Sequence, residues 1–179
     1  MDKQDYCAEI CALGAHKAVL IEVSKIPFER EFRKMCESNA CGMYGKSWMC
    51  PPYVGDIDEL ISKAKSYTYS IVYQTVGTLE DSYDFEGMME AGAAMNVLTQ
   101  KIRDTLSESL CNPLFLGAGG CRICAKCAKA DDKPCLFPDK AMSSLEAYGI
   151  SVSQLAQSCN MKYIHGENTV TYFGAVLFN

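Results

Sequence analysis

A run of closely spaced cysteines in the second half of the chain constrains its fold and chemistry more than any other feature. Cys121, Cys124 and Cys127 are spaced by two intervening residues, and Cys135 follows shortly before Pro138. A short turning loop can place three such thiolates around one face of a cubic cluster, and a later cysteine can then close the coordination. The spacing is therefore typical of a [4Fe–4S] ferredoxin loop.

Structural zinc is the alternative for these four cysteines. Sites in which four cysteines hold zinc usually consist of two CxxC pairs separated by a dozen or more residues. The three crowded cysteines do not divide into two such pairs. Gly117, Gly119 and Gly120 precede them and allow the backbone to approach a cluster closely, with amide N–H groups directed at sulfur. Four basic side chains of this segment could offset the cluster's negative charge: Arg122, Lys126, Lys129 and Lys133.

A second group of cysteines precedes a pair of prolines in the first half of the chain. Cys36, Cys41 and Cys50 form this group, and Pro51 and Pro52 follow directly. Cysteine followed by proline recurs at the closing ligand of ferredoxin loops. The group predicts a second cluster, which has a distant fourth ligand, shares ligands with the first cluster, or leaves one iron open. We call residues 36–53 the first cysteine loop and residues 121–138 the second.

The remaining four cysteines have weaker signals. Cys7 and Cys11 are four residues apart, so a helix would place both on one face, where either could be the missing fourth ligand. They could equally be small buried side chains, as free cysteines often are. Cys111 and Cys159 are expected to serve packing on the same ground.

Composition narrows the class of protein. The 179 residues include 11 cysteines and carry a formal net charge of −5, with a pI near 5.1, which argues against nucleic-acid and acidic-membrane partners. No uncharged apolar run approaches the about 20 residues of a membrane-spanning helix. The start, from Met1 to Asp5, lacks the basic-then-apolar order of a signal peptide. We therefore expect a cytoplasmic protein whose reduced thiols bind metal.

Several catalytic motifs are missing from the sequence. A radical S-adenosylmethionine enzyme requires CxxxCxxC, but the third cysteine position after Cys7 and Cys11 is Gly14. There is no glycine-rich phosphate loop ending in Lys-Ser or Lys-Thr. His16 and His165 are isolated in the sequence, and we assign them no catalytic role.

The pattern of apolar residues predicts one α/β domain over residues 1–179. Asp56 followed by Glu59 predicts the start of a helix, and apolar residues at every third or fourth position predict a long helix over residues 86–109. Short helices are expected within residues 141–158. The expected strands are residues 18–23, 69–76, 114–116 and 170–178. Strands alternating with helices favour a four-stranded, mostly parallel sheet, with both cysteine loops meeting at one end.

Several of these segments together resemble one family. Residues 41–53, CGMYGKSWMCPPY, resemble the CxxYGxxWxCPPY segment of the predicted metal-binding proteins known as domain of unknown function 2284. Further similarities are residues 121–128, 135–138, 144–152 and 171–174. The resemblance implies metal binding through the cysteines of both loops, in proteins typical of anaerobic bacteria and archaea. It implies no reaction. Glu146, in the third of these segments, is either close to a cluster or substrate or an ordinary surface carboxylate.

Three functions remain open at this point. A cluster ligated by four thiolates has no iron free for substrate, which favours electron transfer with a larger redox partner. If Cys36, Cys41 and Cys50 alone hold a cluster, its open iron is a Lewis acid for a small thiol, sulfur or hydroxy-acid substrate of an enzyme. The third function is a zinc-stabilised interaction module. The sequence does not determine the oligomeric state.

Overall fold

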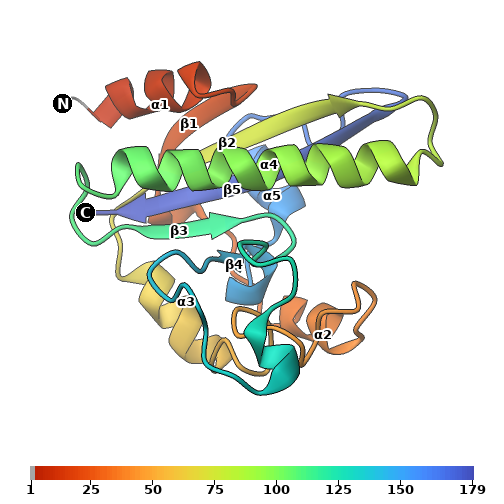
Figure 1. Cartoon of the computed structure of the whole chain (residues 1–179). Coiled ribbons are helices and arrows are strands. Elements are labelled where there is room, and N and C mark those ends of the chain that lie inside the picture. The colour runs from red at the N-terminus through yellow and green to blue at the C-terminus, as the bar shows by residue number, and fades with distance from the viewer. Residues whose placement is uncertain (1–2) are drawn as a thin grey trace.

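A five-stranded sheet forms the centre of the computed structural model, which describes residues 3–179. Met1 and Asp2, the first residues of the segment in which a signal-peptide pattern was sought, lie outside the described residues. The strands are β1 (Lys17–Glu22), β2 (Tyr69–Thr78), β3 (Leu114–Gly117), β4 (Ser143–Ser144) and β5 (Thr169–Phe178). Their order across the sheet is β1-β2-β5-β3-β4 (Figure 1). The four predicted strands are confirmed within one or two residues at each end, and β4 is additional.

The predicted parallel sheet is wrong. β1 pairs with β2, β2 with β5 and β5 with β3, all antiparallel, and only the short β3–β4 contact is parallel. β2 and β3 do run in the same direction, with helix α4 (Phe85–Leu106) between them in the chain, as the prediction requires. The last strand, however, inserts between them in the opposite direction and pairs with β2 over its whole length. An alternating order of strands and helices does not exclude such an insertion.

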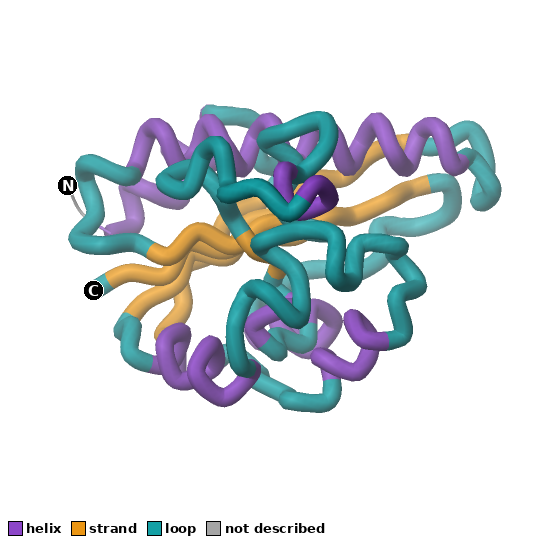
Figure 2. Tube along the Cα trace, turned by 60° about the horizontal axis from the view of Figure 1, so that its bottom comes forward, coloured by secondary structure: helices purple, strands orange, loops and turns teal. Residues whose placement is uncertain are grey.

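Two apolar layers cover the two faces of the sheet. Successive side chains of a strand point to opposite faces, so Ile71 and Tyr73 of β2 face one layer and Val72 faces the other. The helices α1 (Lys3–Ala12) and α4 pack on the first face. On the second face lie α3 (Ile57–Lys65), α5 (Val152–Ser158) and the short 3-10 helix η3 (Glu146–Tyr148). Figure 2 shows helices on both sides of the strands.

The predicted helix starts and lengths are largely confirmed. Asp56 caps α3, because its Oδ1 accepts hydrogen bonds from the backbone N–H groups of Asp58 at 2.9 Å and Glu59 at 3.3 Å. The long helix ends at Leu106, slightly earlier than predicted. Within residues 141–158, where short helices were expected, the structure has the short strand β4 followed by the helices η3 and α5. The other helical turns are η1 (Val23–Lys25), α2 (Phe32–Glu37) and η2 (Ala128–Asp131). Within the described part of the chain, no helix has both the length and the apolar character needed to cross a bilayer.

Candidate metal centre

The two cysteine loops lie side by side beneath the sheet, on the face covered by α3 and η3 (Figure 1). The first loop begins within α2, which carries Cys36, and the second follows β3. A Cβ atom built on Gly120, next to Cys121, would stand 3.2 Å from the Sγ atom of Cys50. Cys41 of the first loop also lines a surface hollow together with cysteines of the second. The expected meeting of the two cysteine segments is thus present in the structure.

The four cysteines of the second loop surround one small, mostly apolar space. Cys121, Cys124, Cys127 and Cys135 are all partly buried and all line it. Ile123, Leu136 and Phe137 complete the wall from the same loop, and residues 47–49 close it from the first loop. Burial raises the pKa of the Cys124 thiol, and the three neighbouring thiols of the group raise it further. The three other thiols of the group are therefore close enough for their charges to act on Cys124.

Cys127 differs from Cys124 in its hydrogen bonds. Burial acts to raise the pKa of its thiol, but hydrogen bonds from the backbone N–H groups of Lys129 and Trp48 and from the Ser47 side chain outweigh burial, so the pKa is lowered. Ser47 and Trp48 belong to the first loop. N–H and O–H groups directed at sulfur favour the thiolate, which is the form that binds a metal or cluster. The donors around Cys127 therefore fit a cluster ligand.

Side chains of both loops hold the two segments together. The indole Nε1–H of Trp48 donates to the backbone oxygen of Lys133 at 2.9 Å. The ammonium group of Lys129 lies 4.3 Å from the ring centroid of Tyr53 and 5.3 Å from that of Trp48, and it pairs with Asp132. From β4, the Ser143 hydroxyl donates to the backbone oxygen of Met49 at 2.8 Å. The contacts of Trp48 and Lys129 fix the first loop against the second, and the contact of Ser143 fixes it to β4.

The three cysteines of the first loop lie close to the second group. Burial raises the pKa of the Cys50 thiol, a hydrogen bond with Ser47 lowers it, and the charges of Cys41, Cys36 and Cys121 raise it. Burial raises the pKa of the Cys36 thiol, and the negative charge of Glu146 raises it further. Burial also raises the pKa of the Glu146 carboxyl.

Arg33 connects α2, which carries Cys36, to η3, which begins at Glu146. Its Nη2 donates to the backbone oxygen of Ala147 at 3.2 Å and its Nη1 to that of Gly55 at 3.0 Å. The two elements are packed against each other. Glu146 is therefore a partly buried carboxylate beside the first cysteine group, and the expectation of an ordinary surface carboxylate is wrong.

The structure does not bring Cys7 or Cys11 to either loop. Both lie on α1, which packs on the opposite face of the sheet, where Cys7 is partly buried against the apolar layer and Cys11 is exposed. Cys159 is 4% exposed and belongs to the core, as predicted. Cys111 is exposed, so the packing role expected for it is wrong. Within residues 3–179, no three Cys, His, Asp or Glu side chains stand close enough together to hold a single metal ion.

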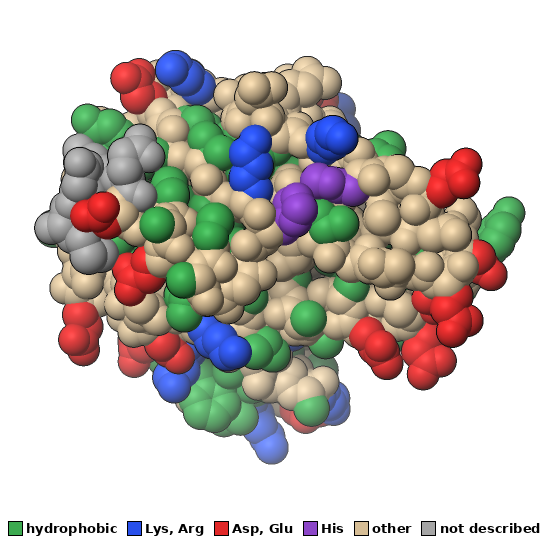
Figure 3. All heavy atoms as spheres, turned by 90° about the horizontal axis from the view of Figure 1, so that it is seen from above, with side chains coloured by type: hydrophobic (Ala, Val, Ile, Leu, Met, Phe, Trp, Pro, Cys, Tyr) green, Lys and Arg blue, Asp and Glu red, His purple; other side chains and the backbone are tan. Residues whose placement is uncertain are grey.

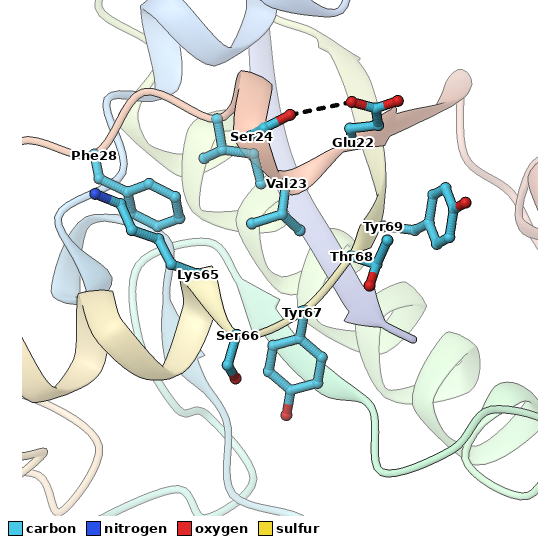
Figure 4. A pocket seen from close by; sticks show the side chains of 10 residues that line it. Glu22, Val23, Ser24, Phe28, Lys65, Ser66, Tyr67, Thr68 and Tyr69 are labelled. Atoms are coloured by element: carbon cyan, nitrogen blue, oxygen red, sulfur yellow. Dashed lines mark hydrogen bonds between the residues drawn. The ribbon is translucent and has the colours of Figure 1, made fainter.

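A wide hollow of about 770 Å³ lies away from the cysteines, between the end of β1 and the start of β2. Figure 4 shows its walls, in which the ammonium group of Lys65 lies 5.5 Å from the ring centroid of Phe28 and Ser24 donates to Glu22. None of its lining residues is a cysteine or a histidine. The candidate metal centre is therefore the paired cysteine loops and not this hollow.

The comparisons with known proteins agree with the motifs. A family model described as predicted metal-binding protein (DUF2284) matches residues 19–178. No curated protein and no solved structure matches the chain. The matched range contains both cysteine loops and Glu146 but begins after Cys7 and Cys11. The chain therefore belongs to the DUF2284 family of predicted metal-binding proteins.

Proposed function

We propose that this member of a metal-binding family is an iron–sulfur protein, in which the four cysteines of the second loop hold a [4Fe–4S] cluster. The observation that carries the proposal is the single space lined by Cys121, Cys124, Cys127 and Cys135. One tetrahedral zinc ion would bring four sulfurs within about 3.8 Å of each other, because each Zn–S bond is about 2.3 Å. A cubane takes one thiolate at each of four irons, so its ligands stand around a space. The Cys127 donors support the same assignment.

The residues around this space suit electron transfer to a protein partner. When bound, the cluster supplies one-electron redox chemistry. Trp48 and Ile123 line the space and limit the access of water. Water access and hydrogen bonds to the sulfur atoms together set the reduction potential of such a centre. Leu136 and Phe137, directly after Cys135, are 65% and 46% exposed. These two side chains offer a redox partner an apolar contact surface next to the ligand Cys135. A partner bound there would lie close to the cluster, and a short distance between redox centres favours electron transfer.

A second cluster at the first loop gives a second candidate function. Cys36, Cys41 and Cys50 supply three thiolates. Among the charged side chains that act on the Cys36 thiol, the carboxylate of Glu146 has the largest effect. A cluster held by three thiolates has one iron for a weaker ligand or a substrate. The chain would then be an enzyme that uses this iron as a Lewis acid on a small thiol, sulfur or hydroxy-acid substrate. Glu146 would bind the iron or move a proton beside it.

The metal content of anaerobically purified protein tests the main proposal. We expect brown protein with iron and acid-labile sulfide in equal amounts. Cys124→Ala should lose the second-loop cluster, whereas the matched variant Cys111→Ala, at an exposed cysteine between α4 and β3, should keep the wild-type content. Colourless protein with stoichiometric zinc would refute the cluster and leave a zinc-stabilised interaction module. Equal loss from both variants would refute the ligand assignment.

Electron paramagnetic resonance separates the two candidate functions. In reduced wild-type protein, two clusters give two signals, and Cys50→Ala should remove only one of them. If the first-loop iron is open, a small thiol should change that signal, and Glu146→Gln should alter it without loss of iron. A spectrum that neither the thiol nor Glu146→Gln changes would refute the enzyme and leave the electron carrier.

A further inference from the structure

The two histidines of the chain, isolated in the sequence, form a pair in the structure. The rings of His16 and His165 are perpendicular, with centroids 5.0 Å apart. His16 directly precedes β1, and its backbone N–H donates to the backbone oxygen of Gln74 in β2 at 2.8 Å. His165 lies in the connection between α5 and β5. Figure 3 shows the two histidine side chains next to each other at the surface, with basic side chains beside them.

The pair lines a basic hollow of about 440 Å³, which shares no lining residue with the cysteine site. Lys17 and Lys162 supply its positive charges, and no Asp or Glu is among its lining residues. The ammonium group of Lys17 donates one hydrogen bond to the backbone oxygen of Asn160 at 2.9 Å, which leaves two N–H groups for a ligand. The chemistry of these walls is suited to an anion.

A buried amide at the same hollow has an unused acceptor. Gln74 is 1% exposed and lines the hollow. Its Nε2 lies 2.9 Å from Nε2 of His165, and its Oε1 has no hydrogen-bond partner among the residues that the structure describes. The Nε2 atom of Gln74 carries only N–H groups, so the ring nitrogen that faces it must accept, which requires a neutral ring. Burial favours that neutral form by lowering the pKa of His165, as do the charges of His16 and Lys162. The amide oxygen then needs a donor from elsewhere, because buried polar atoms without partners are rare.

We propose that this hollow binds a small anion that carries its own hydroxyl group, such as hydrogen phosphate or a hydroxycarboxylate. The negative charge is bound by Lys17 and Lys162, and the hydroxyl donates to Oε1 of Gln74. His16, Lys17 and Lys162 are exposed, so these side chains can move to admit the hydroxyl to the buried amide. The assignment is independent of the proposed cluster, since it uses other residues.

Matched pairs of anions test the role of the hydroxyl. The ring C–H signals of His16 and His165 are followed by NMR in the full chain at a pH of about 8. Hydrogen phosphate and sulfate then have the same charge, but only hydrogen phosphate has a hydroxyl. Glycolate and acetate form a second such pair. We expect hydrogen phosphate to bind about tenfold more tightly than sulfate, the factor that one hydrogen bond supplies.

The outcome of each comparison distinguishes the sources of the ligand. Tight binding of hydrogen phosphate indicates a phosphate-bearing ligand, whereas glycolate binding without phosphate binding indicates a hydroxycarboxylate. Equal binding of both members in both pairs would overturn the proposal, as would an absence of saturable shifts.

Two variants test the residues assigned to the site. Lys162→Gln should weaken hydrogen phosphate and sulfate by the same factor, and Lys101→Gln, an exposed lysine on α4, serves as its matched control. Gln74→Leu should abolish the preference for hydrogen phosphate over sulfate. A preserved preference in folded Gln74→Leu, or equal effects of the two lysine variants, would refute the assignment. If Gln74→Leu does not fold, the wild-type anion pairs and the lysine variants decide the question.

Discussion

Adding a single methyl group at Gly174 should destabilise the sheet through its contact with Tyr73. Gly174 on β5 and Tyr73 on β2 are cross-strand partners. A Cβ atom at position 174 would stand 2.5 Å from Cζ and from the hydroxyl oxygen of Tyr73. The ring cannot easily move, because it is fully buried and its hydroxyl donates to Oγ1 of Thr99 on α4 at 3.0 Å. The tyrosine ring thus occupies the space above the glycine, in the manner by which aromatic residues cover glycines in sheets.

The magnitude follows from two opposing terms. Overpacking a closely packed core costs about 1–3 kcal/mol, and three atoms of the Tyr73 side chain within 2.8 Å place Gly174→Ala at the upper end. Gly174 has no positive φ, so alanine fits the backbone and gains about 0.5 kcal/mol from the less flexible unfolded chain. The net loss is about 2 kcal/mol in the free energy of unfolding, which lowers Tm by about 4–8 °C for a chain of this size.

A double-mutant cycle measured by urea denaturation checks this reasoning. Tyr73→Leu removes the far end of the ring and by itself costs about 3 kcal/mol, as large-to-small core substitutions do. In that background Gly174→Ala should be neutral or slightly stabilising, so the two changes couple by about 2 kcal/mol. Gly117→Ala on β3 is the control, since its Cβ would meet only Thr99 at an ordinary 3.5 Å. Additive effects at Gly174 and Tyr73 would refute the packing argument.

Three further outcomes are expected. Asp56→Ala should lower the free energy of unfolding by about 1 kcal/mol in urea denaturation, because α3 loses its cap; an unchanged midpoint would contradict this. Arg103→Met should cost about 2 kcal/mol and speed amide exchange near residue 140, because the buried guanidinium donates to the backbone oxygen of Lys140 at 2.8 Å; unchanged exchange there would argue against this anchor. Burial raises the pKa of Cys159 to about 11, so its thiol is protonated at neutral pH. Alkylation followed by mass spectrometry should therefore modify exposed Cys111 first, with Cys159 reacting only as the pH approaches its raised pKa, and equal rates at neutral pH would contradict its burial.

The positions of most elements could be predicted from local patterns. The β-branched and aromatic runs of β2 and β5 have the composition of strands, and Asp56 is a cap whose partners are two and three residues away. Strand direction could not be predicted in the same way, because side chains alternate between faces in parallel and antiparallel strands alike. The insertion of β5 between β2 and β3 depends on packing across the whole sheet.

The cysteine spacing by itself determined which thiols can form a group. Cys121, Cys124 and Cys127 are so close in the chain that any short loop keeps their sulfur atoms near one another, whatever the rest of the fold does. The same reasoning grouped the cysteines of the first loop. Membership of the family followed from these local motifs, and the family match confirmed it.

Only the tertiary structure decided which distant residues join these groups. It placed Trp48 and Ser47 against Cys127 and Glu146 near Cys36, and it paired His16 with His165. It also placed α1, with Cys7 and Cys11, on the face of the sheet away from the cysteine loops. The physical reason is that contacts between residues far apart in the chain depend on strand order and on the face each helix covers. Both result from the burial of apolar surface over the whole domain and not from local spacing.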